Sequence, residues 1–76
     1  MTDTLDAEIV VQIRAEMLRQ HLTMDDLAQR LDLPLGTLRA RLATPRGLVI
    51  GHLSKIADAL GMDLADLVAR AERTAA

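Results

Sequence analysis

Residues 23–44, TMDDLAQRLDLPLGTLRARLAT, constrain the fold more than any other stretch of this chain. Thr23 is a favourable N-cap residue, and two aspartates follow it in the first turn of the predicted helix, where the helix dipole stabilises negative charge. Leu27, Ala28 and Leu31 recur at helical spacing and would share one face. This part of the stretch predicts a short helix with one buried face, and we expect a second helix to cross it closely at Ala28.

A proline divides the stretch into two halves. Pro34 disfavours a helical conformation at Leu33, which would end the first helix, and its fixed φ suits the first position of a second helix. Leu38 and Leu42 are spaced to face the core together. Two short helices with a tight turn between them are the helix-turn-helix pattern.

The flanking sequence has the pattern of three more helices, the first over about residues 5–20, each with an apolar stripe at helical spacing. The stripes are Ile9, Val10, Ile13 and Met17; Leu53, Ile56, Ala57 and Leu60; and Leu64, Leu67, Val68 and Ala71. Residues 43–47 are typical of a loop, and Gly61 would end the helix that precedes it. Residues 1–4 and the tail after Arg73 are polar or small, so we expect no stable helix there.

In their order and spacing these features resemble the lambda-repressor-like (Cro-type) helix-turn-helix family over about residues 9–68. The residues that carry the resemblance are Thr23, Leu27, Ala28, Leu31, Leu33, Thr37, Leu38, Leu42 and the segment KIADALG at 55–61. The resemblance implies an all-α, five-helix DNA-binding fold in a single domain, 1–76, with its core at about 5–73 and the helix-turn-helix at 23–44. His21 stands where the family usually has a glycine that closes the first helix. A left-handed histidine is tolerable but strained, so a turn that differs from the family's is expected here.

The resemblance also implies how DNA would be read. In this family the second helix of the motif lies in the major groove, which assigns the base contacts by position to Leu35, Gly36, Arg39 and Ala40. Arg39 could hold a guanine by two hydrogen bonds, whereas Leu35 and Ala40 could contact thymine methyl groups. Gly36 would let the backbone approach the DNA closely. Two alternatives stay open: Leu35 as a core or dimer residue, and Arg39 as an ordinary surface charge.

Contacts to phosphates would come from side chains around the motif and from N–H groups at the N-termini of its helices. The candidates are Thr23, Thr37, Arg41, Thr44, Arg46, His52 and Lys55. Met24 departs from the family, because a phosphate-binding glutamine is common at this position and a thioether cannot donate a hydrogen bond. We therefore expect DNA binding of modest or shape-dependent affinity. The alternative for His52 is an exposed histidine without a ligand.

The formal net charge of -2 conceals an uneven distribution of charge along the chain. Residues 1–32 carry seven acids and three bases, residues 58–76 carry four acids and two bases, and residues 33–57 carry four bases and no acid. A basic segment on the helix-turn-helix is what phosphate binding requires. The alternative is that these four bases only keep a leucine-rich stretch soluble.

Composition excludes several classes of function. The absence of Phe, Tyr and Trp argues against base stacking as a binding mode, and without cysteine the chain has no disulfide or thiolate metal site. It contains no Gly-rich phosphate loop, Ser-His-Asp set or cluster with metal-ligand spacing, so we expect no enzyme activity, no cofactor and no metal. No signal pattern and no apolar run near the roughly 20 residues of a membrane span is present. We expect a cytoplasmic protein that does not enter a membrane.

The sequence therefore predicts a repressor-like transcriptional regulator, of phage or bacterial type, that binds double-stranded DNA at a palindromic operator. One such domain covers one half-site, so a homodimer is expected. Candidate dimer surfaces are the apolar stripe of the last helix and apolar residues such as Val11 and Val49. The alternatives are an adaptor that binds a protein partner through Met24 and Leu35, and a fragment whose missing domain senses a ligand.

Overall fold

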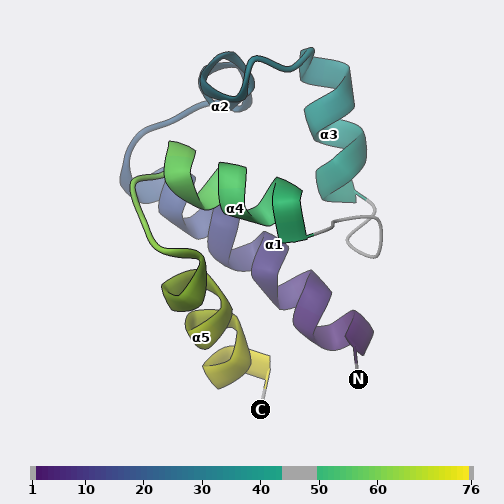
Figure 1. Ribbon diagram of the computed structural model, residues 1–76, viewed down its shortest axis with the longest axis vertical. Helices are drawn as coiled ribbons and strands as arrows, with labels where there is room; N and C mark the ends of the chain where they lie inside the picture. Colours follow the sequence, from purple (N-terminus) through teal and green to yellow (C-terminus); the bar gives the residue numbers. More distant parts are fainter. Residues whose placement is uncertain (1, 44–49, 76) are drawn as a thin grey trace.

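The computed structural model describes residues 2–43 and 50–75, which form five helices and no strand (Figure 1). The helices are α1 (Thr2–Arg19), α2 (Met24–Leu31), α3 (Leu35–Ala43), α4 (Ile50–Ala59) and α5 (Leu64–Ala75). The expected all-α, five-helix architecture is thus confirmed, with α2 and α3 as the helix-turn-helix. In the part of the chain so described, no helix is both long and apolar enough to cross a membrane.

Both terminal helices are longer than the sequence pattern predicted. The expectation of non-helical ends is wrong, because α1 begins at Thr2 and α5 continues past Arg73 to Ala75. The two helices pack side by side, and Gln12 Nε2 donates a hydrogen bond to Thr74 Oγ1 at 3.3 Å. Leu5 also packs against the core. Contacts between distant parts of the chain therefore stabilise helical turns that have little local signal of their own.

The start of α2 is a capping box. Thr23 Oγ1 accepts a hydrogen bond from the Asp26 backbone N–H at 3.1 Å, and the Thr23 N–H donates to Asp26 Oδ2 at 2.9 Å. The bond from the Thr23 N–H is the main reason that the pKa of Asp26 lies below its usual value. The sequence predicted Thr23 as the cap, and the structure adds Asp26 as its reciprocal partner.

Three helices end in the same way, with one residue in the left-handed region. These residues are His21 (φ 57°) after α1, Asp32 (φ 55°) after α2 and Gly61 (φ 73°) after α4. After each of them the next N–H bonds back to a carbonyl five residues earlier, at 2.8 Å for Leu22 to Met17, 2.9 Å for Leu33 to Ala28 and 3.0 Å for Met62 to Ala57. The stop at Gly61 is confirmed. His21 adopts the left-handed conformation in spite of its side chain, with the same type of closing hydrogen bond as at Gly61.

The turn inside the helix-turn-helix differs in detail from the prediction. Asp32 ends α2 by its left-handed conformation, two residues before the proline. The Pro34 carbonyl accepts a hydrogen bond from the Leu38 N–H at 3.1 Å, and α3 begins at Leu35. Pro34 therefore precedes α3 instead of occupying its first position, one residue away from the predicted placement.

One aliphatic core joins all five helices. Its buried members are Ile9, Val10, Ile13, Met17, Leu27, Ala28, Leu38, Leu42, Leu53, Ile56, Ala57, Leu60, Leu67 and Ala71. Every helix contributes the stripe that its spacing predicted, although Leu31, Leu64 and Val68 are only half-buried. Leu67 and Ala71 are fully buried within this one chain. The expectation that the α5 stripe forms a dimer surface is therefore wrong for Leu67 and Ala71, because α5 uses the centre of this stripe to pack inside its own domain.

Polar side chains join four helices at the C-terminal end of α4. Arg30 Nη1 of α2 donates to the Ala59 carbonyl at 2.9 Å, and Gln20 Nε2, just past α1, donates to the Leu60 carbonyl at 2.7 Å. Gln20 also donates to Glu16 Oε2 at 2.8 Å, and Arg70 of α5 pairs with Glu16 Oε1 at 3.0 Å. The hydrogen bond from Gln20 is the largest of several interactions that lower the pKa of Glu16.

These contacts determine where α3 stands. Among the described helices, α3 packs its backbone mainly against α2, while α2 also packs on α4 and α4 packs on α5. α3 lies at the end of the molecule opposite to both chain termini (Figure 1). The second helix of the motif is thus carried outward on α2, with its inward leucines in the shared core.

Replacement of Ala28 by leucine tests the packing of the motif. Ala28 is only 3% exposed, so Ala28→Leu should overpack its surroundings and lower the free energy of unfolding by about 1 to 3 kcal/mol. Ala65→Leu on the exposed side of α5 is the matched control and should change it much less. Urea denaturation of both variants measures the difference, and equal stabilities would show that the site near Ala28 has room for a larger side chain.

Candidate nucleic-acid interface

α3 presents an exposed face that carries three of the four predicted base contacts. Gly36, Arg39 and Ala40 are exposed, whereas Leu38 and Leu42 on the other side are buried. Ala43, also exposed, continues the same face at the helical spacing of positions 36, 39, 40 and 43. The sequence analysis did not include Ala43, although its spacing from Gly36 could have placed it there. Arg39 is the one side chain of this face that can make two directed hydrogen bonds.

Leu35, the fourth predicted base contact, has a different environment. It is half-buried and packs against the core, as does Met24 at the start of α2. The interpretation of Leu35 as a core residue thus has structural support, and its contact with a base stays a prediction. Because Met24 and Leu35 both place part of their surface inside the domain, less of that surface is left for the alternative role in binding a protein partner.

The N-terminus of α2 is poorly suited to phosphate binding. The hydroxyl of Thr23 already accepts the capping bond, so only its proton is available for a phosphate oxygen. Asp25 and Asp26 place negative charge in the first turn, and Met24 offers no donor. Thr37 in the first turn of α3 is half-buried. The phosphate contacts predicted for Thr23 and Thr37 stay predictions.

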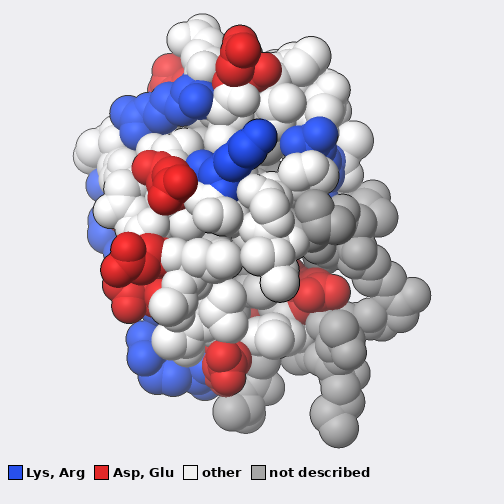
Figure 2. Space-filling model, viewed as in Figure 1, with Lys and Arg blue, Asp and Glu red and all other residues white. Residues whose placement is uncertain are grey.

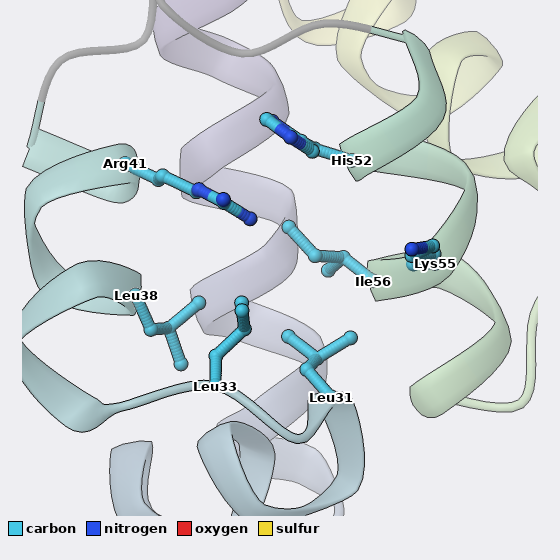
Figure 3. A pocket seen from close by; sticks show the side chains of 7 residues that line it. All are labelled: Leu31, Leu33, Leu38, Arg41, His52, Lys55 and Ile56. Atoms are coloured by element: carbon cyan, nitrogen blue, oxygen red, sulfur yellow. The ribbon is translucent and has the colours of Figure 1, made fainter.

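Three other predicted phosphate contacts surround one pocket. Arg41 of α3 and His52 and Lys55 of α4 line a pocket of about 130 Å³ between the two helices. Figure 3 shows the Arg41 and His52 side chains pointing into the space between α3 and α4. The aliphatic part of the lining is Leu31, Leu33, Leu38 and Ile56. His52 and Lys55 are three residues apart in α4, but Arg41 belongs to α3, so only the packing of the helices shows that Arg41 shares their site.

The exposure of these basic residues differs. Lys55 is exposed, whereas Arg41 and His52 are half-buried. The Nδ1 atom of His52 is buried and has no hydrogen-bond partner among the described residues. A buried polar atom without a partner is uncommon in folded proteins. Thr44 and Arg46, the remaining predicted phosphate contacts, lie outside the described residues, as does Val49.

Charge on the surface is arranged in patches. Figure 2 shows basic groups over the upper half of one face, where α2, α3 and α4 lie, with acidic groups between some of them. The middle of the same face is uncharged. The same view also shows basic groups at the lower left. Along the sequence, residues 33–57 contain four bases and no acid. Within the described ranges, no group of three or more His, Cys, Asp or Glu side chains could hold a metal ion.

Comparison with known families decides what this arrangement is. The sequence profile of the Cro/C1-type HTH DNA-binding domain matches residues 12–72, which is most of the chain. The chain belongs to this family. The Cro/C1-type domain has DNA as its partner, and the match covers α2, α3 and α4 completely. The first turns of α1 and the last turn of α5 lie outside the matched range. Searches of curated proteins and of solved structures gave no significant match.

Gly36 offers a test of close approach by DNA to this Cro/C1-type domain. A Cβ atom built at Gly36 would meet no other atom within 4 Å, so the fold itself does not require a glycine there. Gly36→Ala should stabilise the free protein by about 0.5 to 1 kcal/mol, because alanine is the better helix former. The added methyl group should nevertheless weaken DNA binding if the α3 backbone lies against the bases.

Gly51 supplies the matched control, since it occupies the same place in α4 and its Cβ would also meet open space. Gly51→Ala should stabilise the free protein by a similar free energy, seen as a higher melting temperature, and should leave DNA affinity nearly unchanged. Thermal unfolding and fluorescence anisotropy on duplex DNA measure the two effects. Unchanged affinity in Gly36→Ala would remove Gly36 from the set of residues that face the bases.

Proposed function

We propose that this Cro/C1-type domain is a transcriptional regulator, repressor-like, that binds a palindromic operator in duplex DNA as a homodimer. α3 would lie in the major groove, and the domain would act in the cytoplasm by binding alone, without catalysis. The observation that carries the proposal is the division of α3 into a buried side with Leu38 and Leu42 and an exposed side with Gly36 and Arg39. A helix of this kind at the end of the molecule fits the docking geometry of helix-turn-helix domains.

Base recognition in this proposal depends mainly on Arg39. Its guanidinium group can donate two parallel hydrogen bonds to O6 and N7 of a guanine, which is worth about 1 to 3 kcal/mol of discrimination against another base. Ala40, exposed beside it, can contact a thymine methyl group. With a single long polar side chain on the exposed face, direct readout would cover few positions, and the shape of the DNA would supply part of the specificity.

Phosphate binding would be concentrated on the side of α3 and α4. Arg41, His52 and Lys55 surround one pocket, and no acid occurs in residues 33–57. The N-terminus of α2 carries Met24 and two acids and would contribute less. This asymmetry supports modest affinity for a single copy, because few phosphates are neutralised per domain.

Dimer formation would then bring two copies to adjacent half-sites, about 34 Å apart. With the centre of the α5 stripe buried, the large exposed apolar side chains among the described residues are Val11 (50%), Leu18 (77%) and Ile50 (74%). Val11 and Leu18 lie two turns apart on the same face of α1. We therefore place the dimer surface on this face of α1.

Sedimentation equilibrium tests the dimer with and without DNA. We expect two copies on a palindromic site, and the double variant Val11→Gln and Leu18→Gln should lower the dimer fraction because it removes exposed apolar surface from α1. Ile50→Gln is the control and should leave self-association unchanged. A single copy per site at tens of micromolar protein would exclude the homodimer, and a loss of dimer only in Ile50→Gln would move the interface to α4.

The DNA contacts are tested by replacing two exposed cationic residues, Arg39 and Lys55, whose loss should affect DNA binding in different ways. On a site selected from a random duplex pool, Arg39→Ala should cost about 1 to 3 kcal/mol of binding free energy and much less on random DNA. Lys55→Ala should weaken binding to both and lower the salt slope by about one unit per subunit. Arg73→Ala removes an equal charge from the last turn of α5 and should change little.

Anisotropy titrations at two salt concentrations separate these outcomes. Equal losses on specific and random DNA in Arg39→Ala would assign Arg39 to a phosphate instead of a base. If none of the variants affects binding, or if the parent domain shows no salt-dependent binding to duplex DNA, the proposed regulatory role is excluded.

A further inference from the structure

The pocket between α3 and α4 has more apolar surface than a DNA phosphate could use. Besides its three basic side chains, it is lined by Leu31, Leu33, Leu38 and Ile56. In Figure 3 these aliphatic groups lie together on one side, and Arg41 and His52 lie on the other. A phosphate would contact only the basic side, whereas a molecule with an anionic end and an apolar body would contact both.

The size of the pocket limits the apolar body. Its volume is about 130 Å³, close to that of engineered aliphatic cavities of about 150 Å³ that accept benzene. A body of about six carbon atoms therefore fits. Each methylene group that leaves water for such a pocket favours binding, so a short hydrocarbon chain contributes more than the anionic end alone.

The basic side of the pocket is suited to a carboxylate. No ion pair of Arg41, His52 or Lys55 is recorded in the part of the chain that the structure describes. The fork of a guanidinium group matches the two oxygens of a carboxylate. His52 also lines the pocket, and its buried Nδ1 atom has no hydrogen-bond partner among these residues, so the imidazole retains unused hydrogen-bonding capacity.

The location of the pocket gives an occupant influence over α3. The backbone of α3 packs mainly against α2, and the pocket is lined by side chains of both α3 and α4. A molecule bound there would touch both helices. It would also use cations that the proposed function assigns to the DNA phosphates.

We propose that this pocket binds a small carboxylic acid with an apolar body of about six carbon atoms, and that the bound acid competes with DNA for Arg41, His52 and Lys55. The binding of the acid is inferred from the pocket alone, whereas its competition with DNA rests on the proposed function. Bound acid would release the protein from its operator, as an inducer does.

The binding half is tested on the DNA-free protein by methyl NMR with hexanoate as the probe. Hexanoate should shift the methyl resonances of Leu33, Leu38 and Ile56 saturably, and those of Leu27 and Leu67, which do not line the pocket, should stay in place. Affinity should be at least about tenfold higher than for acetate, which lacks four methylene groups. Hexanol, without a charge, should also bind more weakly than hexanoate.

Inorganic phosphate separates this proposal from a site that serves DNA phosphates only. Phosphate that binds as well as hexanoate, or hexanoate that causes only linear, unsaturable shifts, would overturn the proposal. Lys55→Gln should weaken hexanoate binding several-fold, and Arg73→Gln should leave it unchanged as the matched loss of charge. The Leu27 and Leu67 resonances report in the same spectra that each variant is folded, so equal affinities in the two variants would also overturn it.

The competition half is tested by anisotropy on duplex DNA. If hexanoate and DNA exclude one another, hexanoate at ten times its Kd should raise the apparent Kd for DNA about tenfold, whereas acetate at the same concentration should act only as salt. Saturable hexanoate binding with no effect on DNA affinity would overturn the competition. Absence of DNA binding in the parent protein would instead exclude the proposed function and leave the NMR result as the measure of the pocket.

Discussion

The position of α3 depends on how the C-terminal end of α4 is held. The last carbonyls of a helix have no partner within it, and here the Ala59 and Leu60 carbonyls accept hydrogen bonds from Arg30 and Gln20. These bonds join α4 to α2 and to the end of α1, and the pair of Glu16 with Arg70 adds α5. α2 is thus fixed to the rest of the domain, and α3 is carried on α2. A change at this junction would move α3 without touching it.

The distribution of charge around the helix-turn-helix indicates which part of the surface could attract DNA phosphates. The capping box of Thr23 and Asp26 stabilises α2 but places negative charge at its N-terminus. Helix N-termini without such charge commonly bind phosphate groups. The acid-free stretch 33–57 compensates, because two of its cations, Arg41 and Lys55, line one pocket together with His52. A domain with a negative total charge can therefore still present a locally positive surface beside α3.

Local signals and long-range packing contribute in different ways to the helix ends. Gly61 takes its left-handed conformation easily, whereas His21 and Asp32 adopt it at a steric cost. Each of these two residues is followed by a leucine, Leu22 or Leu33, that is half-buried, and Leu22 packs on the core. Burial of such a side chain after the turn offsets the strain of the residue before it.

The sequence by itself determined the five helices, the inward leucines of α3, the cap at Thr23, the stop at Gly61 and the family of the chain. All of these follow from spacing or from the φ preference of single residues, which depend on near neighbours in the chain. Only the tertiary structure decided that α1 and α5 extend to Thr2 and Ala75, and that α5 buries the centre of its apolar stripe inside its own domain.

The tertiary structure also decided that Leu35 packs on the core and that Arg41, His52 and Lys55 share one pocket. The physical reason is that these features depend on which helices lie beside one another. Periodicity shows which face of a helix is buried, but not which helix covers that face. The gap between α3 and α4 is a property of that packing alone.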